Sequence, residues 1–299
     1  MHMNEAKQEG ASPRPNKLKD YYQLMKFTLS FTVVFSSVVC YLLVPGIEFD
    51  FISVLLLFVG GMLVTGAANA INQIAEKDTD AMMKRTASRP VASGRMSMDE
   101  AATFSVVAAV FGIFIIGLCF NWTAAGLSAF SLFLSGFIYT PLKKIHSIAV
   151  LVGAIPGALP CLIGWAAGDP SLGIGGWILF TLQFFWQFPH FWAIAWVSHE
   201  DYTKAGFRLL PSAGGPTKHA AVQAILYSVL LIPIGYLPFA FEMSGIVSMV
   251  IVAIANVVML WQCIRLFREM DVKAARRVMF GSYIYLPVVL LSLLANKLG

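Results

Sequence analysis

The chain has 299 residues, of which 58% are hydrophobic and only 12% are charged, and its formal net charge is +5. A soluble domain carries about 25% charged residues. This composition, together with a mean hydropathy of +0.73, excludes an ordinary soluble domain and indicates an integral membrane protein.

The first 26 residues are polar and differ from the rest of the chain. They include Lys7, Arg14 and Lys26 and contain no apolar run of the kind found in signal peptides. We therefore expect residues 1–26 to be a polar cytoplasmic N-terminal segment. A transit peptide is a less favoured alternative, because acidic residues interrupt the stretch. Residues 27–299 are expected to form a single membrane domain.

Nine apolar runs follow, each close to the 18–20 residues that an α-helix needs to cross a bilayer. Short breaks with turn residues, such as "AGDPSLG", separate them. We therefore predict an all-α, polytopic membrane protein. Its nine transmembrane helices are expected at about 27–45, 52–73, 101–119, 122–141, 148–167, 174–196, 220–240, 245–265 and 280–296.

Positive charge gathers on one side of this arrangement. With the N-terminus in the cytoplasm, the cytoplasmic segments contain or border all of the 21 Lys and Arg residues except Lys297. The opposite loops carry only acidic charges. This positive-inside pattern predicts a cytoplasmic N-terminus and an external C-terminus, and it explains the net charge without nucleic-acid binding. The cytoplasmic segments are 1–26, 74–100, 142–147, 197–219 and 266–279.

A cluster of charges follows the second run, in "NQIAEKDTDAMMKRTASRP" (72–90). If the helix continues beyond the membrane, Asn72, Glu76 and Asp80 lie one turn apart on one face. Stacked carboxylates repel each other, and Mg²⁺, which prefers oxygen ligands and substrate phosphates, would reverse that repulsion. The alternative is a solvated helix end that neighbouring Lys and Arg side chains neutralise.

A second polar group ends the sixth run, in "FFWQFPHFWAIAWVSHEDYTKAGFRLLP" (184–211). Pro189 is expected to kink the helix and open a cavity. His190 lies inside the apolar run. It is either a buried residue with a hydrogen-bond partner, or a ligand to a metal centre or a proton carrier. His199 and Asp201 follow at the membrane edge.

Basic residues near these two groups suit a polyanion. Arg85 and Arg89 can each bind phosphate oxygens through two bonds at once. Tyr139, Lys143 and Lys144 occur in "YTPLKKIHS" (139–147), at the cytoplasmic end of the fourth run. The lysines either anchor the helix at the membrane surface or join the arginines in a diphosphate site.

These stretches resemble the motifs of one enzyme family. "DAMMKRTASRP" is similar to the D-x-x-M-x-R-T-x-x-R-P run of the protohaem IX farnesyltransferases (haem O synthases), a branch of the UbiA intramembrane prenyltransferase superfamily. "WQFPHFWAIAWVSHEDYTKAGFRLLP" is similar to that branch's W-Q-x-P-H-F … D-Y … A-G … L-P segment, and "YTPLKK" with "GAIPGALPCLIGW" also matches. The resemblance covers roughly residues 20–295.

The resemblance implies a UbiA-type bundle of nine helices around a central cavity. Two acidic loops would meet at its cytoplasmic mouth and bind Mg²⁺ and prenyl diphosphate. It also implies a reaction in which a farnesyl group passes from farnesyl diphosphate to a vinyl group of haem b, a substrate, to give haem O. We further expect the protein to lie in the bacterial cytoplasmic membrane. Haem A synthase is expected as a possible partner.

The resemblance also implies roles for particular residues. The Mg²⁺ ligands, which also act in catalysis, would be Asn72, Glu76, Asp80 and Asp201. The diphosphate would bind at Arg85, Arg89, Lys143, Lys144 and Tyr139, and haem b at His190 and His199.

This chain departs from the family pattern at two places. Glu76 stands where the family often has aspartate, and Glu200 with Asp201 replaces the D-x-x-x-D second motif of members that prenylate aromatic acids. One alternative is another UbiA-type enzyme, acting on a quinone precursor or a chlorophyll-like tetrapyrrole. Another is a transporter, which is less favoured because the acids gather at one membrane face.

Overall fold

The structure, a computed structural model, describes residues 16–211 and 215–298. Within these ranges the chain forms helices joined by turns and no extended strand. The elements are α1 (Lys17–Leu24), α2 (Phe27–Leu42), α3 (Phe51–Ala75), α4 (Lys77–Met82), α5 (Met98–Cys119), α6 (Trp122–Phe133), the π-helix η1 (Leu134–Tyr139), α7 (Thr140–Leu142), α8 (Ala149–Gly168), α9 (Ile174–Val197), α10 (His199–Lys204), α11 (Lys218–Ala240), α12 (Ile246–Glu269) and α13 (Val272–Ala295).

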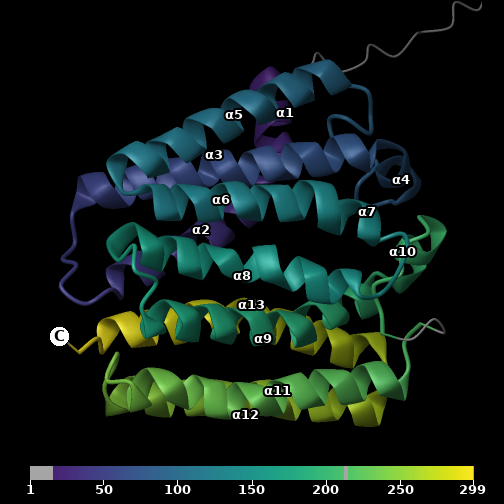
Figure 1. Cartoon of the computed structure of the whole chain (residues 1–299). Helices are drawn as coiled ribbons and strands as arrows, with labels where there is room; N and C mark the ends of the chain where they lie inside the picture. The colour runs from purple at the N-terminus through teal and green to yellow at the C-terminus, as the bar shows by residue number, and fades with distance from the viewer. Residues whose placement is uncertain (1–15, 212–214, 299) are drawn as a thin grey trace, which may run out of the picture.

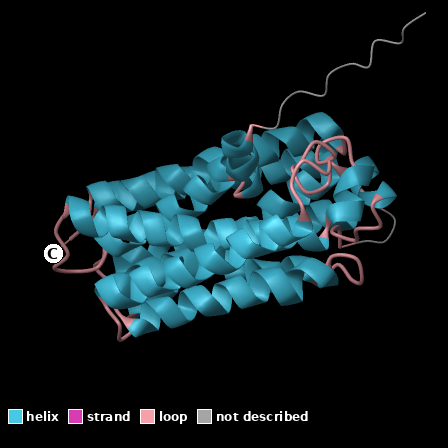
Figure 2. Ribbon diagram, turned by 90° about the horizontal axis from the view of Figure 1, so that it is seen from above, coloured by secondary structure: helices cyan, strands magenta, loops and turns pink. Residues whose placement is uncertain are grey.

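The long helices lie side by side in one bundle, as Figure 1 and Figure 2 show. α3 packs against α5, α2 packs against α8, and α9 contacts α8, α11 and α13. α11 and α12 form the edge opposite α5 (Figure 1). The largest apolar core surrounds α9, where Leu179 and Leu182 are fully buried. The fifth and sixth predicted spans, α8 and α9, therefore form the buried centre of the bundle, and α8 is the more completely buried of the two.

Seven of the described helices are long and apolar enough to cross a membrane, and the bent pair α1–α2 makes an eighth. The chain is thus a multi-span membrane protein. Each of the nine predicted runs coincides with a helix or a series of helices in the described residues. α9 occupies the place of the sixth run but is not among the seven, because Gln183, Gln187 and His190 make it more polar.

The segment predicted to lie outside the membrane at 266–279 is almost wholly helical, because both helices that flank it are longer than the predicted runs. α12 continues to Glu269 and α13 begins at Val272, so that only residues 270–271 connect them. The Asp271 side chain starts α13 by accepting a hydrogen bond from the N–H of Ala274. The charged residues of this stretch therefore lie on helix ends.

The helix that was considered to continue from the second run through Asp80 is interrupted at Glu76. α3 ends at Ala75, and Glu76 leaves the helical conformation with φ −105° and ψ 12°. The short helix α4 then follows from Lys77. Asn72, Glu76 and Asp80 consequently do not form one row on one helix, and the two carboxylates can reach different partners.

The segment predicted as a polar leader contributes to the fold. Residues 1–15 lie outside the described part of the chain, but α1 packs on α3 and its Leu24 is fully buried near Ala70 and Val91. α1 and α2 meet at a bend of 48°. Residues 17–24, within the predicted N-terminal segment, therefore pack against the helical bundle.

Lys297, the exception to the charge asymmetry, lies at the end of the bundle opposite α4, α7 and α10 (Figure 1). Its ammonium group donates hydrogen bonds to the carbonyl oxygens of Leu42, Val44 and Ile47, at 3.0, 2.7 and 3.1 Å. The last carbonyls of a helix lack partners within the helix. Lys297 therefore satisfies the end of α2 and ties the C-terminus to it.

Candidate active site

The two charged segments that follow α3 and α9 meet at one end of the bundle, where α4, α7 and α10 lie (Figure 1). Met83 of the first segment packs in one apolar cluster with Phe207 of the second. The guanidinium of Arg85 donates a hydrogen bond of 3.1 Å to the hydroxyl of Tyr202. These contacts hold the two predicted loops together.

Glu76 forms a buried ion pair with Lys143, in which 2.5 Å separates Oε1 from Nζ. The backbone at Lys143 is fixed by the N–H of Arg208, which donates to its carbonyl at 2.9 Å. The ammonium lies over the rings of Tyr139 and Phe207, 4.8 and 5.6 Å from their centroids. Burial lowers the pKa of Lys143, and the Glu76 carboxylate opposes that shift. The Glu76 carboxylate therefore stabilises the buried ammonium of Lys143.

Asp80 is fully buried and accepts hydrogen bonds from Arg89 at 2.7 Å on Oδ1 and 2.6 Å on Oδ2. The Thr86 hydroxyl donates a hydrogen bond of 2.8 Å to the backbone carbonyl of Asp80 and so closes the turn between Asp80 and Thr86. A guanidinium has five N–H donors. Arg89 can therefore hold Asp80 and bind a second anion with its remaining donors.

Oxygen atoms suited to a divalent cation occur beside these ion pairs. Asn72 lies one turn before Glu76 on α3, and its Oδ1 is buried without a hydrogen-bond partner among the described residues. A buried polar atom of this kind calls for a water molecule or an ion. Amide and carboxylate oxygens are ligands that Mg²⁺ accepts. Asn72, Glu76 and Asp80 thus fit the cation that the sequence predicts.

The residues alone do not enclose a metal ion. Across the described ranges, no group of three or more His, Cys, Asp and Glu side chains is close enough to hold one. Mg²⁺ commonly takes one or two carboxylates and completes its shell with water and substrate phosphates. This arrangement is therefore consistent with a cation that arrives with a phosphate ligand.

Three predicted site residues lie at the margin of the cluster. Asp201, on α10, forms no ion pair with another described residue. Lys144 is exposed to solvent. His199 packs directly against the backbone of Gly215. In the described part of the chain, the ion pairs of Glu76 and Asp80 are with Lys143 and Arg89 and involve none of these three residues.

His190 lies on α9 and faces α13. Its Nδ1 is 2.8 Å from the Ser282 hydroxyl oxygen, and its ring stacks on Trp186 with 4.8 Å between centroids. The Ser282 hydroxyl donates its hydrogen to the carbonyl of Met279 at 2.6 Å. Ser282 must then accept from His190, so that Nδ1 carries the proton of a neutral imidazole. The lone pair of Nε2 is left for another partner.

Tyr283 connects His190 to the charged cluster. Its ring meets His190 edge-on, with 5.2 Å between centroids. It also lies within electrostatic range of Arg85 and Tyr202. The histidine and the cationic end of the bundle therefore belong to one neighbourhood.

Two residues of this neighbourhood, Lys26 and Ser282, were not predicted from the sequence. Lys26 was assigned to the leader, yet its ammonium lies within electrostatic range of Glu76, Asp80 and Lys143. Its position as the last cation before the first apolar run was the available signal. No comparable signal marked Ser282, because a serine in an apolar helix commonly bonds to its own backbone.

The chain is similar to known proteins over nearly its whole length. The model of the UbiA prenyltransferase family matches residues 33–286. A protoheme IX farnesyltransferase of Cytophaga hutchinsonii is 43% identical, over 95% of this chain and 99% of that protein. One of Christiangramia forsetii is 40% identical, over 96% of both.

Solved structures share the fold at lower identity. A digeranylgeranylglyceryl phosphate synthase aligns with a TM-score of 0.76 and 23% identity, over 94% of this chain and 98% of that one. A UbiA homolog from Archaeoglobus fulgidus, bound to GPP and Mg²⁺, aligns with a TM-score of 0.69 and 15% identity, over 92% and 99%. With the family model matching most of the chain, this protein belongs to the UbiA prenyltransferase family.

Proposed function

We propose that this protein transfers a farnesyl group from farnesyl diphosphate to a vinyl group of haem b, which yields haem O and diphosphate. The observation that carries the proposal is the similarity, at 40–43% identity and nearly full length, to relatives named protoheme IX farnesyltransferase. The cations that pair with Glu76 and Asp80 also support it, because they can bind and stabilise an ionised diphosphate.

The diphosphate is proposed to bind between the two buried ion pairs. Lys143 and Arg89 are each held by one carboxylate and retain N–H donors for phosphate oxygens. Arg85, held by Tyr202, supplies a further guanidinium. Tyr139, under the Lys143 ammonium, and Lys144 at the exposed rim complete the set that the sequence predicts. Fixed cations of this kind stabilise the charge of a departing diphosphate.

Mg²⁺ is the cofactor proposed for this site, with Asn72, Glu76, Asp80 and Asp201 as its protein ligands. The buried, unpartnered Oδ1 of Asn72 supports this assignment. Bound with the diphosphate, Mg²⁺ would neutralise negative charge on the leaving group. Without Mg²⁺, Lys143 and Arg89 hold the two carboxylates in position.

The chemistry then follows from the charges and the apolar surroundings. The bond between the farnesyl C1 carbon and oxygen breaks, and the diphosphate leaves with the electron pair. The vinyl group of haem b donates its π electrons to the allylic cation, which forms the new carbon–carbon bond. Water adds to the resulting cation beside the porphyrin and loses a proton. Aromatic faces such as Phe207 and Tyr139 shield the allylic cation from early attack by water.

His190 is proposed to contact haem b, through the iron or a propionate group. Its protonated Nδ1 donates to Ser282, which leaves Nε2 free to bind iron or to accept a hydrogen bond. His199, which lies nearer the predicted cytoplasmic surface, is the second candidate. We further place the protein in the bacterial cytoplasmic membrane, with the N-terminus inside, the C-terminus outside and haem A synthase as a partner.

Haem analysis in cells provides the test. The chain would be expressed in bacteria that lack haem O. The extracted haems would be separated by chromatography, and their masses would be determined by mass spectrometry. We expect a haem that carries a hydroxyethylfarnesyl group, and none in cells expressing the Asp80→Asn variant. A chain that inserts into the membrane but yields only haem b would overturn the assignment of the acceptor. A prenylated quinone precursor would then identify a different member of the family.

A further inference from the structure

The helices α12 and α13 form a hairpin whose turn, residues 270–271, lies at the end of the bundle opposite Lys297 (Figure 1). The ammonium of Lys218, which begins α11, lies over the ring of Phe267, 5.6 Å from its centroid. The start of α11 thus packs on the base of the hairpin. Both helices extend past the apolar runs predicted at 245–265 and 280–296. The base of the hairpin therefore lies where the membrane surface is expected.

The exposed face of α12 ends in two arginines. Ile254, Val257 and Trp261 are exposed, and their spacing of three and four residues places them on one face of the helix. The same spacing continues to Arg265 and Arg268, of which Arg268 is exposed. The Arg265 guanidinium lies over the Trp261 ring, 5.1 Å from its centroid. A tryptophan in this position is typical of the interface between membrane and water.

The exposed face of α13 begins with two cations in the same way. Lys273 and Arg276 are exposed, and Phe280 and Ile284 continue this face at intervals of four residues. Because α12 and α13 are antiparallel neighbours, the basic residues of both helices gather at the base of the hairpin. They lie in line with two apolar faces that point away from the bundle, toward the lipid.

Acidic residues neutralise only part of this positive charge. Glu269 accepts hydrogen bonds from Arg265 at 2.8 Å and from Arg277 at 2.7 Å, which braces the two helices. Residues 265–277 contain five basic and two acidic side chains, and the second acid, Asp271, caps α13. Three basic residues form no ion pair with another described residue, namely Arg268, Lys273 and Arg276.

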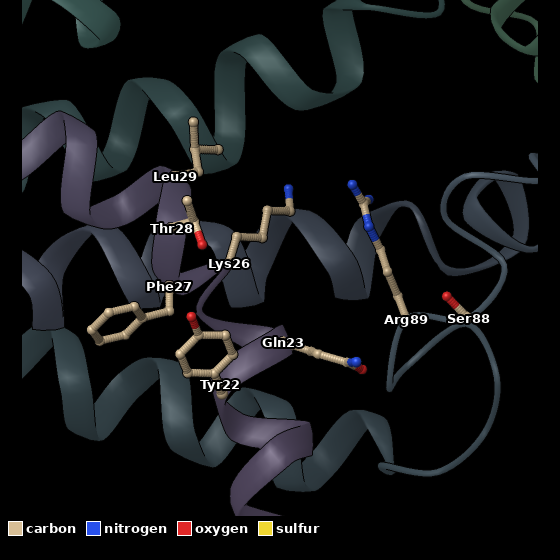
Figure 3. A pocket seen from close by; sticks show the side chains of 8 residues that line it. All are labelled: Tyr22, Gln23, Lys26, Phe27, Thr28, Leu29, Ser88 and Arg89. Carbon is tan, nitrogen blue, oxygen red and sulfur yellow. The ribbon is translucent and has the colours of Figure 1, made fainter.

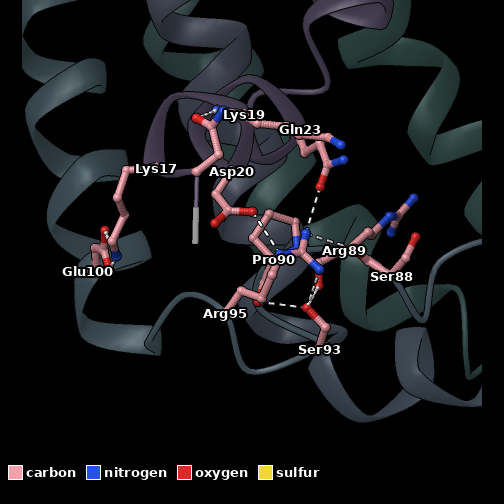
Figure 4. A network of polar contacts seen from close by, with 11 residues as sticks. Lys17, Lys19, Asp20, Gln23, Ser88, Arg89, Pro90, Ser93, Arg95 and Glu100 are labelled. Carbon is pink, nitrogen blue, oxygen red and sulfur yellow. Dashed lines mark hydrogen bonds and ion pairs between the residues drawn. The ribbon is translucent and has the colours of Figure 1, made fainter. Parts of the chain in front are cut away.

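Basic residues on the α1 side of the same end are paired within the protein. Lys17 forms an ion pair of 2.7 Å with Glu100, and Arg95 forms one of 2.8 Å with Asp20, as Figure 4 shows. These pairs join α1 to the start of α5 and to the loop before it. The side chains involved are therefore committed to the fold.

Two further basic side chains on that side point inward. Asn69 and Gln73 of α3 hold the bend between α1 and α2 by donating hydrogen bonds to backbone carbonyls at the end of α1. Figure 3 shows Lys26 and Arg89 reaching into one pocket beside this bend. They belong to the neighbourhood of the candidate active site. The α12–α13 hairpin differs, because its unpaired basic residues continue faces that contact lipid.

We propose that the base of the α12–α13 hairpin binds an acidic phospholipid, with the phosphate at Arg268, Lys273 and Arg276 and the acyl chains along the faces that contain Trp261 and Phe280. Basic residues beside spanning helices attract acidic headgroups, and a guanidinium can hold two phosphate oxygens. Topology explains why positive charge lies at this end of the bundle, but not why it extends two lipid-facing stripes.

A lipid bound there would hold the start of α13, the helix whose Ser282 meets His190. The inference does not depend on the reaction that the protein catalyses, because it concerns a surface outside the candidate active site.

The test is native mass spectrometry of the purified full chain in a neutral detergent. The protein would be titrated with phosphatidylglycerol or with phosphatidylcholine of the same acyl chains, and the ratio of lipid-bound to free protein gives each affinity. We expect phosphatidylglycerol to bind at least about tenfold more tightly. Arg268→Gln and Arg276→Gln should each weaken its binding about fivefold and leave that of phosphatidylcholine unchanged, whereas Arg276→Lys should keep most of the affinity.

Lys19→Gln is the matched control, because it removes an exposed charge from the α1 side of the same end and should not change the affinity. Apparent unfolding temperatures in neutral detergent should be equal for all variants, since the replaced side chains are exposed. Equal binding of the two lipids to the wild type would overturn the proposal. Equal losses in Lys19→Gln and Arg276→Gln would also overturn it, because they would reflect net charge alone.

Two competitors identify the occupant. Glycerol phosphate, which carries the phosphate without acyl chains, should not displace the lipid, and complete displacement would refute the role of the apolar faces. A soluble polyglutamate peptide should bind more weakly than phosphatidylglycerol. Tighter, Arg276-dependent binding of the peptide would replace the lipid by an acidic protein partner. All of these measurements are made without substrates, so their failure would leave the proposed function unaffected.

Discussion

Glu76, directly after α3, and Lys143, directly after α7, form an ion pair in which both side chains are buried. The pair joins two segments that are distant in the sequence, and it lies beside the Asp80–Arg89 pair. One pair is buried on both sides, whereas in the other the carboxylate of Asp80 is buried and the Arg89 side chain is 20% exposed. A ligand with negative charge and a bound cation can exchange partners with both.

The Glu76–Lys143 pair should show strong coupling in a double-mutant cycle. Glu76→Gln and Lys143→Met each leave one charge buried without its partner, which costs about 3–5 kcal/mol. The double variant removes both charges and should lose less than the sum of the two single losses. Unfolding in mixed micelles of rising denaturing-detergent content measures these differences. Additive losses would contradict a direct pair.

Asp80→Asn should abolish most turnover while the protein still inserts and folds. The variant keeps the shape of the side chain but removes the charge that holds Arg89 and is proposed to bind Mg²⁺. We expect kcat to fall at least about a hundredfold. Haem O formed per unit of membrane protein measures the effect. Near-normal haem O formation would remove Asp80 from the proposed metal site.

Lys143 should make stability depend on alkaline pH. Its pKa in the folded protein lies below 10.5, because burial disfavours the ammonium. Between the lowered pKa and 10.5 the unfolded chain binds more protons, so the free energy of unfolding rises with pH. The penalty is fully present below the lowered pKa and disappears above 10.5. Lys143→Arg, which stays protonated, should remove this part of the rise.

The measurement is the apparent unfolding temperature of both proteins from about pH 7 to about pH 10. The difference between wild type and Lys143→Arg isolates Lys143 from the other groups that titrate in this range. A difference that stays constant with pH would show that Lys143 keeps its ordinary pKa.

His190→Ala should weaken the binding of haem b at least about tenfold and leave the binding of farnesyl diphosphate unchanged. The reason is that His190 faces Ser282 and Tyr283, and no hydrogen bond or ion pair joins it to Glu76, Lys143, Asp80 or Arg89 among the described residues. Ser282→Ala removes only the partner of Nδ1 and should cause a smaller loss. Absorption titrations with haem b follow both variants. Equal haem affinity of His190→Ala and wild type would shift the haem contact to His199.

The membrane helices were predictable because one physical requirement dominates them. A chain in the bilayer must satisfy its backbone hydrogen bonds internally, so each apolar run forms a helix. The runs at 52–73 and 148–167 correspond to α3 and α8 within a few residues. The extent of the helices was not predictable at 266–279, a charged segment expected outside the membrane, where α12 continues to Glu269 and α13 begins at Val272. Charge alone does not end a helix.

The residue types of the candidate site were predictable, but their partners were not. The spacing of Asn72, Glu76 and Asp80 suggested one helical row, whereas α3 ends at Ala75 and each carboxylate has its own cation. The sequence also placed Lys26 in a leader, because nothing local reveals that Asn69 and Gln73 bend the chain around it.

The sequence by itself therefore determined the class of the protein, the approximate place of its spans and the chemistry of its charged segments. These depend on composition and short-range pattern, which a single chain displays directly. The tertiary structure alone decided which charges pair, which way His190 faces and how Lys26 reaches the cluster. Those contacts join residues far apart in the chain, and their geometry is set by how whole helices pack.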